Sequence, residues 1–310
     1  GIWIADKHNN NIAHYDYESN LLLKFGGFGD EKGKFKEPSG IALFNDKLYV
    51  TDRLNHRVQV FKDNSTFLFS FGTKGDSAGE FNEPSGIAID RYRRLYVSDR
   101  INNRIEVFDT TGKYIDEIGK DIGFKHPCGI IVDSFGYIFV VDEANGRVVE
   151  LDPFGDPICQ FGEKGYDPGK FVLPQDVAIS GDGEKLFVTD KSQKKVVIFG
   201  VYNKEGGGAM SAGESETPII NCLKSCYPVP FSKGVNISYS IAQKGFVSAK
   251  VYDVTGRLVK KLVNGLQDRG WYTIQWDGNE GNRRVVSSGV YFIRLETGDF
   301  LSTKKVLLVR

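Results

Sequence analysis

One phrase recurs five times within the first two hundred residues of the chain. It reads IWIADKHNNNIAHY from Ile2, LYVTDRLNHRVQVF from Leu48, LYVSDRINNRIEVF from Leu95, IFVVDEANGRVVEL from Ile138 and LFVTDKSQKKVVIF from Leu186. The aspartates of the phrase lie 46, 47, 43 and 48 residues apart. Repeats of this length built from short β-rich runs are typical of propeller blades with four strands each. The sequence therefore predicts an all-β fold.

A leader precedes four of the five phrases: PSGIAL at Pro38, PSGIAI at Pro84, PCGIIV at Pro127 and PQDVAI at Pro174. In the unit that starts at Pro84, period-2 alternation predicts strands at residues 86–90, 94–99, 103–109 and 113–119. A phenylalanine stands three residues before each leader proline, and we expect these rings to fill the seams between blades. They are Phe35, Phe81, Phe124 and Phe171.

The repeats resemble the NHL family of β-propellers over residues 1–200. The family pattern of a Pro-x-Gly-Ile leader, a Leu-Tyr-Val-x-Asp strand and an Asn-x-Arg start to the third strand is met in the third unit. The matching residues are Pro84, Gly86, Leu95, Tyr96, Asp99, Asn102 and Arg104. The last unit departs from the pattern, with Asp176, Gln193 and Lys195 at the glycine, asparagine and arginine positions.

The Asp-x-x-Asn-x-Arg loop has a structural interpretation and a functional one. An aspartate at the end of one strand and an arginine at the start of the next can close the loop through a charge-assisted hydrogen bond. We favour this structural role, because every repeat carries the pattern. The loop residues are Asp6, Asp52, Asn55, Arg57, Asp99, Asn102, Arg104, Asp142, Asn145, Arg147 and Asp190.

The residue after each aspartate carries the functional interpretation. These residues are Lys7, Arg53, Arg100, Glu143 and Lys191. If the loops share one face, four cations and one anion surround the mouth of the propeller, where they could bind an anionic ligand such as an acidic glycan. Solvated surface charge is the simpler explanation of the same residues. We assign Lys7, Arg53, Arg100 and Lys191 as candidate ligand-binding residues.

No catalytic residue or cofactor site is expected. Some propellers related to NHL proteins are lyases or metal-dependent lactonases, whose ligands converge on the channel. Here His8, His14, His56 and His126 fall at different phases of the repeat, so we expect no shared metal site. Neither a Gly-x-Ser-x-Gly elbow nor a Cys/His pairing stands out. A metal-dependent lyase or lactonase remains the enzymatic alternative to a binding protein.

The repeat stops near Val201, and the composition changes. Residues 1–200 hold 25 basic and 31 acidic side chains, so their net charge is −6, and the remaining 110 residues carry +6. This balance disfavours a binder of bulk nucleic acid, and no apolar run approaches the roughly 18 residues of a membrane helix. We predict a propeller at 1–203, a flexible Gly/Ser/Glu-rich linker at 204–226, and a small antiparallel sandwich at 227–310.

The C-terminal segment resembles the Ig-like fold of flagellar hook-capping proteins and the sorting domains of type IX secretion cargo. The matching residues are Tyr227, Pro228, Pro230 and Phe231, then VYDVTGRLV, the WDG at Trp276, SSGVYF from Ser287 and the closing TKKVLL. Val229 replaces the asparagine of the usual Tyr-Pro-Asn-Pro. The resemblance implies a bacterial protein exported to the cell surface or the medium, with an anchoring, sorting or joining role for this domain.

Cysteine usage bears on the compartment. Cys222 and Cys226 flank three residues at the entrance to the second domain, and export would permit a local disulfide between them. Cys128 on an inner strand and Cys159 on the outer strand of the same unit lie about 14 Å apart, which is too far for a bond. We expect those two thiols to be buried and unbonded.

The strand count leaves both ends of the predicted propeller incomplete. The units contribute three, four, four, four and three strands, so about four and a half blades are present. Unpaired strand edges need a partner. Upstream sequence could have been trimmed, TPIINC at Thr217 could fold back to close a five-bladed ring, or another copy of the chain could complete the edge. We slightly favour trimming.

These observations predict an exported, non-enzymatic interaction or assembly protein. The propeller would be the platform for a protein or glycan partner, and the C-terminal domain the anchor. The structural alternative is a subunit of an extracellular filament whose blades are completed between chains. We expect neither nucleic acid nor a transmembrane segment.

Overall fold

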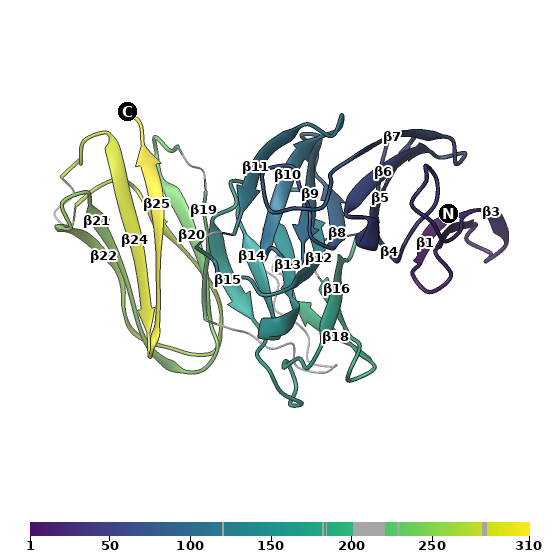
Figure 1. Ribbon diagram of the computed structural model, residues 1–310. Helices are drawn as coiled ribbons and strands as arrows, with labels where there is room; N and C mark the ends of the chain where they lie inside the picture. Colours follow the sequence, from purple (N-terminus) through teal and green to yellow (C-terminus); the bar gives the residue numbers. More distant parts are fainter. Residues whose placement is uncertain (120, 182, 184, 201–220, 228–229, 281–283) are drawn as a thin grey trace. The chain divides into compact units, whose positions relative to one another are not determined.

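A computed structural model describes residues 1–119, 121–181, 183, 185–200, 221–227, 230–280 and 284–310 (Figure 1). The chain divides into two compact units, of which the first lies within Gly1–Val201 and the second within Tyr202–Arg310 apart from one short segment. The described secondary structure consists of strands and two short 3-10 helices, η1 (Arg53–Asn55) and η2 (Glu143–Asn145). The predicted all-β class is confirmed.

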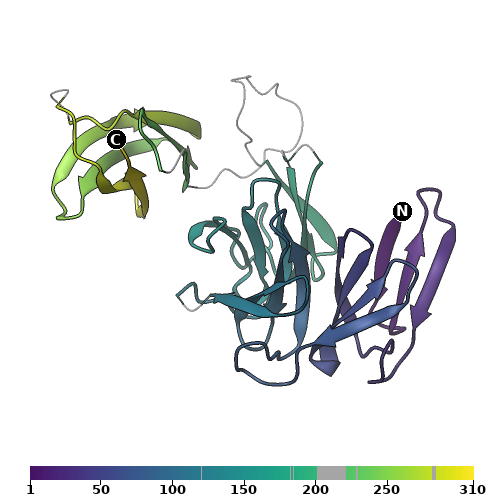
Figure 2. The ribbon, with the colours of Figure 1, turned by 90° about the horizontal axis from the view of Figure 1, so that it is seen from above.

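The first unit contains five antiparallel sheets, each formed by strands consecutive in sequence (Figure 2). The opening sheet has β1 (Ile2–Asp6), β2 (Asn11–Tyr15) and β3 (Leu21–Gly26). Three four-stranded sheets follow: β4 (Pro38–Phe44), β5 (Lys47–Asp52), β6 (Arg57–Lys62) and β7 (Phe67–Phe71); β8 (Pro84–Ile89), β9 (Arg94–Asp99), β10 (Arg104–Asp109) and β11 (Tyr114–Ile118); β12 (Pro127–Val132), β13 (Ile138–Asp142), β14 (Arg147–Leu151) and β15 (Pro157–Phe161). The closing sheet has β16 (Pro174–Ile179), β17 (Lys185–Asp190) and β18 (Lys195–Gly200).

Each of these sheets is one propeller blade, and the strands fall into the predicted groups of three, four, four, four and three. The register gives every blade the same two ends. In blade three, Pro84 pairs with Asp99 at one end, whereas Ile89 pairs with Leu95 at the other. We call the end with the aspartate loops the mouth end and the opposite end the distal end.

The four phenylalanines before the leader prolines lie in the seams between blades, as predicted. Phe35 is fully buried, and its ring centroid lies 6.2 Å from that of Phe25 in blade one and 5.8 Å from that of Phe61 in blade two. Phe81 makes the corresponding contacts with Phe71 and Phe108 at the next seam. Burying a whole ring at each seam removes a large apolar area from water.

The inner strands approach one another backbone to backbone. They lie side by side in chain order: β4 contacts β8, β8 contacts β12, and β12 contacts β16. A Cβ built on Gly40 would lie 2.6 Å from the carbonyl oxygen of Ser85, and one built on Gly129 would lie 2.5 Å from the Cα of Asp176. A Cβ on Gly86 would collide with the carbonyl oxygen of Cys128. The close approach of neighbouring backbones therefore requires glycine at these leader positions.

Gly86→Ala is expected to destabilise the propeller by about 1–3 kcal/mol, because the backbone of the neighbouring blade must move to admit the methyl group. Urea unfolding followed by circular dichroism measures the change. The matched control is Gly181→Ala, since a Cβ at Gly181 meets no atom within 4 Å. Equal stability of the two variants would contradict the packing argument.

The second unit is a two-sheet sandwich around one apolar cluster that includes Trp276, Tyr239 and Ile293. One sheet contains β19 (Cys222–Tyr227), β20 (Val235–Ile241) and β23 (Gly270–Trp276). The other contains β22 (Leu258–Gln267), β21 (Gly245–Asp253), β24 (Gly289–Thr297) and β25 (Phe300–Leu308), in that order.

The predicted linker at 204–226 needs a correction at its end. Residues 222–226 belong to β19, which pairs with β20 from Cys222 opposite Ser240 to Tyr227 opposite Asn236. Leu223 is fully buried in the sandwich core, and this burial explains why the segment is a strand. Residues 204–220 lie outside the described residues, as does Thr217, from which the sequence suggested a strand that would close the ring.

The two terminal blades present apolar side chains to solvent. Ile2 and Ile4 of β1 are 54% and 46% exposed, and Val196 and Ile198 of β18 are 54% and 45% exposed. The strand β1 lies at one edge of its sheet and β18 at one edge of the other. In the part of the chain that the structure describes, no helix has the length and apolar character needed to cross a membrane.

Candidate functional site

The five residues that follow the repeated aspartates surround one cavity at the mouth end. Lys7, Arg53, Arg100, Glu143 and Lys191 come from five different blades and line a cavity of about 300 Å³. The second residue of each leader also lines it, so that Ser39, Ser85, Cys128 and Gln175 form the inner part of the wall. Identical positions in successive repeats are thus brought together by the radial arrangement of the blades.

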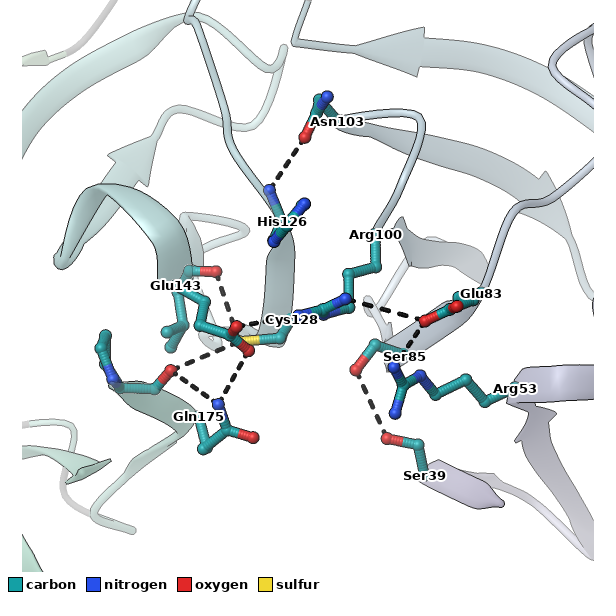
Figure 3. Close-up of polar contacts among 12 residues, drawn as sticks. Ser39, Arg53, Glu83, Ser85, Arg100, Asn103, His126, Cys128, Glu143 and Gln175 are labelled. Carbon is teal, nitrogen blue, oxygen red and sulfur yellow. Dashed lines mark hydrogen bonds and ion pairs between the residues drawn. The ribbon is translucent and has the colours of Figure 1, made fainter. Parts of the chain in front are cut away.

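Three of the mouth cations are paired with carboxylates from neighbouring blades. Figure 3 shows Arg53 and Arg100 on either side of Glu83, and Glu143 beside Arg100. Glu37 Oε2 forms ion pairs with Lys7 Nζ at 3.1 Å and with Arg53 Nη1 at 3.0 Å. Arg53 Nη2 forms a second ion pair, with Glu83. Arg100 lies between Glu83 at 3.7 Å and Glu143 at 2.8 Å. We call this series the charge belt: Lys7, Glu37, Arg53, Glu83, Arg100 and Glu143. The belt connects the first four blades at the mouth.

The belt extends to blade five through an amide. The Nε2 atom of Gln175 donates a hydrogen bond to Glu143 Oε2 at 2.8 Å. Burial alone would raise the pKa of Glu83, but Arg53 and Arg100 hold it below its usual value. Glu83 therefore stays ionised between Arg53 and Arg100 and fixes their guanidinium groups in position.

Sequence reasoning found the four cations and Glu143 at this site but missed two of the carboxylates that pair with the cations, Glu37 and Glu83. Glu37 and Glu83 stand directly before the leader prolines of blades two and three. Their fixed place in the repeat was the available signal, whereas blades four and five have His126 and Leu173 there. The series of ion pairs consequently ends at Glu143 of blade four, and Lys191 of blade five forms no ion pair within the described residues.

In blades two to five, the repeated aspartate holds two loops together beneath the belt. In blade two, Asp52 is fully buried and accepts hydrogen bonds from the backbone N–H of Lys36 at 2.8 Å, from Asn55 Nδ2 at 2.8 Å and from Arg57 Nε at 2.8 Å. Arg57 also donates to the carbonyl oxygens of Glu31 and Lys34. The carboxylate thus joins its own loop to the loop that leads into the same blade.

The other blades repeat this arrangement with local substitutions. Asp99 accepts from Asn82 N, Asn102 and Arg104, and Asp142 accepts from Lys125 N, Asn145 and Arg147. In blade five, Gln193 replaces the asparagine and donates to Asp190 at 3.0 Å. In blade one, Asn9 donates to Asp6 through both its backbone and its side chain. These bonds give the loop residues a structural role.

Blade three contains a buried carboxylate at a position where blade two has an amide. Gln59 accepts a hydrogen bond from Gly33 N at 3.0 Å and donates to Lys34 O and to Asp52 Oδ2. Glu106 accepts from Gly79 N at 3.1 Å and pairs with Arg104 at 3.0 Å, but its Oε2 atom is buried without a partner. Burial raises the pKa of Glu106 to about 7.

Glu106→Gln is expected to remove the loss of folding stability that ionisation of Glu106 causes at high pH. The folded-state pKa of Glu106 lies above its ordinary value of 4.5, so its contribution to stability is complete below pH 4.5 and is lost as the pH rises through about 7. At pH 8 the variant should be more stable than the wild type by roughly 2–3 kcal/mol, and at pH 4.5 this advantage should vanish.

Thermal melts of both proteins between pH 4.5 and 8.5 provide the measurement. Glu18→Gln, which changes an exposed carboxylate of blade one, is the control and should leave the profile unchanged. A pH-independent difference between wild type and Glu106→Gln would rule out titration of Glu106 in this range.

The histidines do not gather at the mouth cavity. His14 stacks on Trp3 at 4.2 Å between ring centroids, and His56 Nδ1 accepts a hydrogen bond from the backbone N–H of Glu83 at 3.2 Å. The backbone N–H of His126 donates to Asn103 Oδ1 at 2.9 Å. Among the residues that the structure describes, no group of three or more His, Cys, Asp or Glu side chains could hold a metal ion.

The proposed disulfide between Cys222 and Cys226 is not formed. Both residues lie on β19, where four residues of extended chain separate Cα atoms by about 13 Å, and a disulfide needs about 7 Å or less. Cys128 lies at the cavity wall, as a buried thiol that donates weakly to Val141 O and Pro174 O. Burial raises its pKa, so the thiol stays protonated. Cys159 is partly exposed, which corrects the expectation of two buried thiols.

Comparison with known families identifies both parts of the chain. Residues 30–128 match a family model described as a 6-bladed beta-propeller, and residues 225–309 match a secretion system C-terminal sorting domain. The chain therefore combines a β-propeller with a type IX secretion sorting domain, and it is exported to the cell surface or beyond. No curated protein matches the chain.

Solved structures resemble the chain only distantly. A virginiamycin B lyase from Staphylococcus aureus has 14% identity and a TM-score of 0.46, with 65% of this chain and 67% of that chain covered. PorZ, a bacterial surface component of the type-IX secretion system of Porphyromonas gingivalis, has 14% identity and a TM-score of 0.39, with 99% and 50% covered. The chain thus spans half of PorZ.

Proposed function

We propose that the protein is a non-enzymatic binding protein of the bacterial surface, whose propeller holds an anionic partner at the mouth. The observation that carries the proposal is a local reversal of charge. Residues 1–200 have a net charge of −6, yet four cations from four blades line one cavity whose wall contains one carboxylate, Glu143. Glu37, Glu83 and Glu143 pair with three of these cations, and Lys191 forms no ion pair within the described residues. An excess of positive charge at the cavity wall attracts ligands of the opposite sign.

The wall offers the chemistry of an acidic glycan site. Ser39, Ser85 and Gln175 supply neutral hydrogen-bonding groups beside the cations, which suits a ligand with hydroxyl and carboxylate groups. The charge belt binds Arg53 and Arg100 on two sides each, whereas Lys7 pairs only with Glu37. Lys191 forms no ion pair within the described residues, and Lys7 is half exposed.

Lys191→Glu is expected to weaken binding of polygalacturonate, an acidic glycan, at least tenfold, because the change places a carboxylate at the mouth. Isothermal titration at two salt concentrations measures the affinity, which should also fall as salt rises. Lys62→Glu, at the distal end of blade two, makes the same change of charge and should bind like the wild type. Equal loss in both variants would indicate a general effect of net charge and refute a mouth site.

The sorting domain supplies the second part of the function. A chain that ends at residue 200 should remain inside the cell envelope of a bacterium with type IX secretion, whereas the full chain should reach the surface or medium. Fractionation followed by immunoblotting measures the distribution. Export of the truncated chain would show that the C-terminal domain acts in assembly and not in sorting.

A filament subunit is the second candidate, because both terminal blades expose apolar side chains. Ile2 and Ile4 of one copy could pack against Val196 and Ile198 of the next, as neighbouring blades pack within one chain. Analytical ultracentrifugation over a hundredfold range of concentration should then show growing assemblies. A monomer at every concentration would exclude this candidate.

A further inference from the structure

The distal end of blades three and four carries a cluster of arginine and aromatic side chains that the mouth does not use. The turn at 90–94 reads DRYRR, and the two adjacent turns of blade four carry Phe135 and Phe154. Tyr92, Phe135 and Phe154 are 59%, 54% and 87% exposed. We call this surface the distal patch: Arg91, Tyr92, Arg93, Phe135 and Phe154.

Hydrogen bonds join the three turns into one surface. Arg91 Nη1 donates to the carbonyl oxygen of Ser134 at 3.3 Å, next to Phe135. Arg94 Nη2 donates to the carbonyl oxygen of Pro153 at 3.2 Å, next to Phe154. Arg91 also donates to the hydroxyl of Tyr92 at 2.7 Å and lies over its ring. The three turns are therefore held together before any partner arrives.

The three turns of the distal patch contain aspartates as well as arginines. Asp133 and Asp152 accept hydrogen bonds from backbone N–H groups of their own turns, and Asp156 is exposed beside Phe154.

Asp90, the acidic residue of the turn at 90–94, is buried and is bound by the backbone N–H groups of Tyr92 and Arg94 and by Arg94 Nε. Arg91 and Arg93 are exposed and form no ion pair within the described part of the chain. Two guanidinium groups are thus available to carboxylates from outside.

Backbone strain at Arg93 gives independent support. The turns at 90–94 and 133–137 make the same hydrogen bonds, and their fourth residues are Arg93 and Gly136. Both adopt left-handed backbone conformations, with φ of +67° for Arg93 and +94° for Gly136. Glycine accommodates this conformation without a Cβ penalty, whereas arginine does not. A strained, exposed arginine is a reason to look for a function.

We propose that the distal patch is a docking surface for a protein whose own surface is acidic and contains apolar or aromatic side chains. Arginine, tyrosine and phenylalanine are enriched at the centres of protein interfaces, where rings supply area and arginine binds carboxylates. The patch lies at the opposite end of the blades from the mouth cavity. The protein can therefore hold this partner and an anionic ligand at the same time.

Binding to two synthetic polypeptides tests the proposal with the full chain. The probes are a random glutamate–tyrosine copolymer and poly-glutamate, immobilised for biolayer interferometry. The wild type should bind the copolymer at least tenfold more tightly than poly-glutamate. Tyr92→Ala and Phe154→Ala should abolish this difference, while Tyr17→Ala, which removes an exposed ring from the distal end of blade one, should preserve it.

Arg93→Gly separates folding from binding. Relief of the left-handed strain should raise the melting temperature by about 2–4 °C, while loss of the guanidinium should weaken copolymer binding at least threefold. Lys191→Glu should leave the preference for the copolymer intact, so that failure at the mouth and failure at the distal patch can be told apart.

Three results would overturn the proposal. The wild type could bind both polypeptides equally, or the patch variants could retain the wild-type preference. Polygalacturonate could also compete with the copolymer and lose its own binding in Tyr92→Ala and Phe154→Ala, which would make the distal patch a glycan site.

Discussion

The mouth of the propeller depends on the hydrogen bonds of one buried aspartate in each of blades two to five, at the end of the second strand. Asp52, Asp99 and Asp142 are fully buried, and each accepts a backbone N–H from the incoming loop together with side-chain donors from its own loop. A buried carboxylate is tolerated only when such donors surround it. The position of the next residue, which lines the mouth, follows from this bond.

The same repeat that stabilises the fold also distributes its functional groups. Because successive blades place equivalent positions around one axis, a residue type repeated in sequence becomes a ring in space. At the mouth the ring is cationic and partly neutralised by Glu37 and Glu83. At the distal end, a single turn departs from its neighbours and gathers arginine and aromatic side chains. Two surfaces with different chemistry therefore lie at opposite ends of one set of blades.

The sequence predicted most of the fold because the determinants are local and periodic. The strand groups, the phenylalanines in the seams and the gathering of Lys7, Arg53, Arg100, Glu143 and Lys191 all follow from repeat phase. The partners of the cations depend on how neighbouring blades are placed, which one repeat does not specify. The strand β19 was missed because Leu223 contributes its buried side chain to a segment with little alternation. The disulfide prediction failed because it placed Cys222 and Cys226 in a loop. On the extended strand β19, the same four-residue separation holds their Cα atoms too far apart for a bond.

Hydrogen exchange at the mouth tests the central claim most directly. The backbone amides of Lys36, Asn82 and Lys125 lie in loops but donate to the buried aspartates at 2.8, 2.7 and 2.7 Å. If these carboxylates organise the mouth, the three amides should exchange at least about 100-fold more slowly than amides in exposed turns, at a rate close to that of the inner strands. Exchange at the rate of exposed turns would contradict the account.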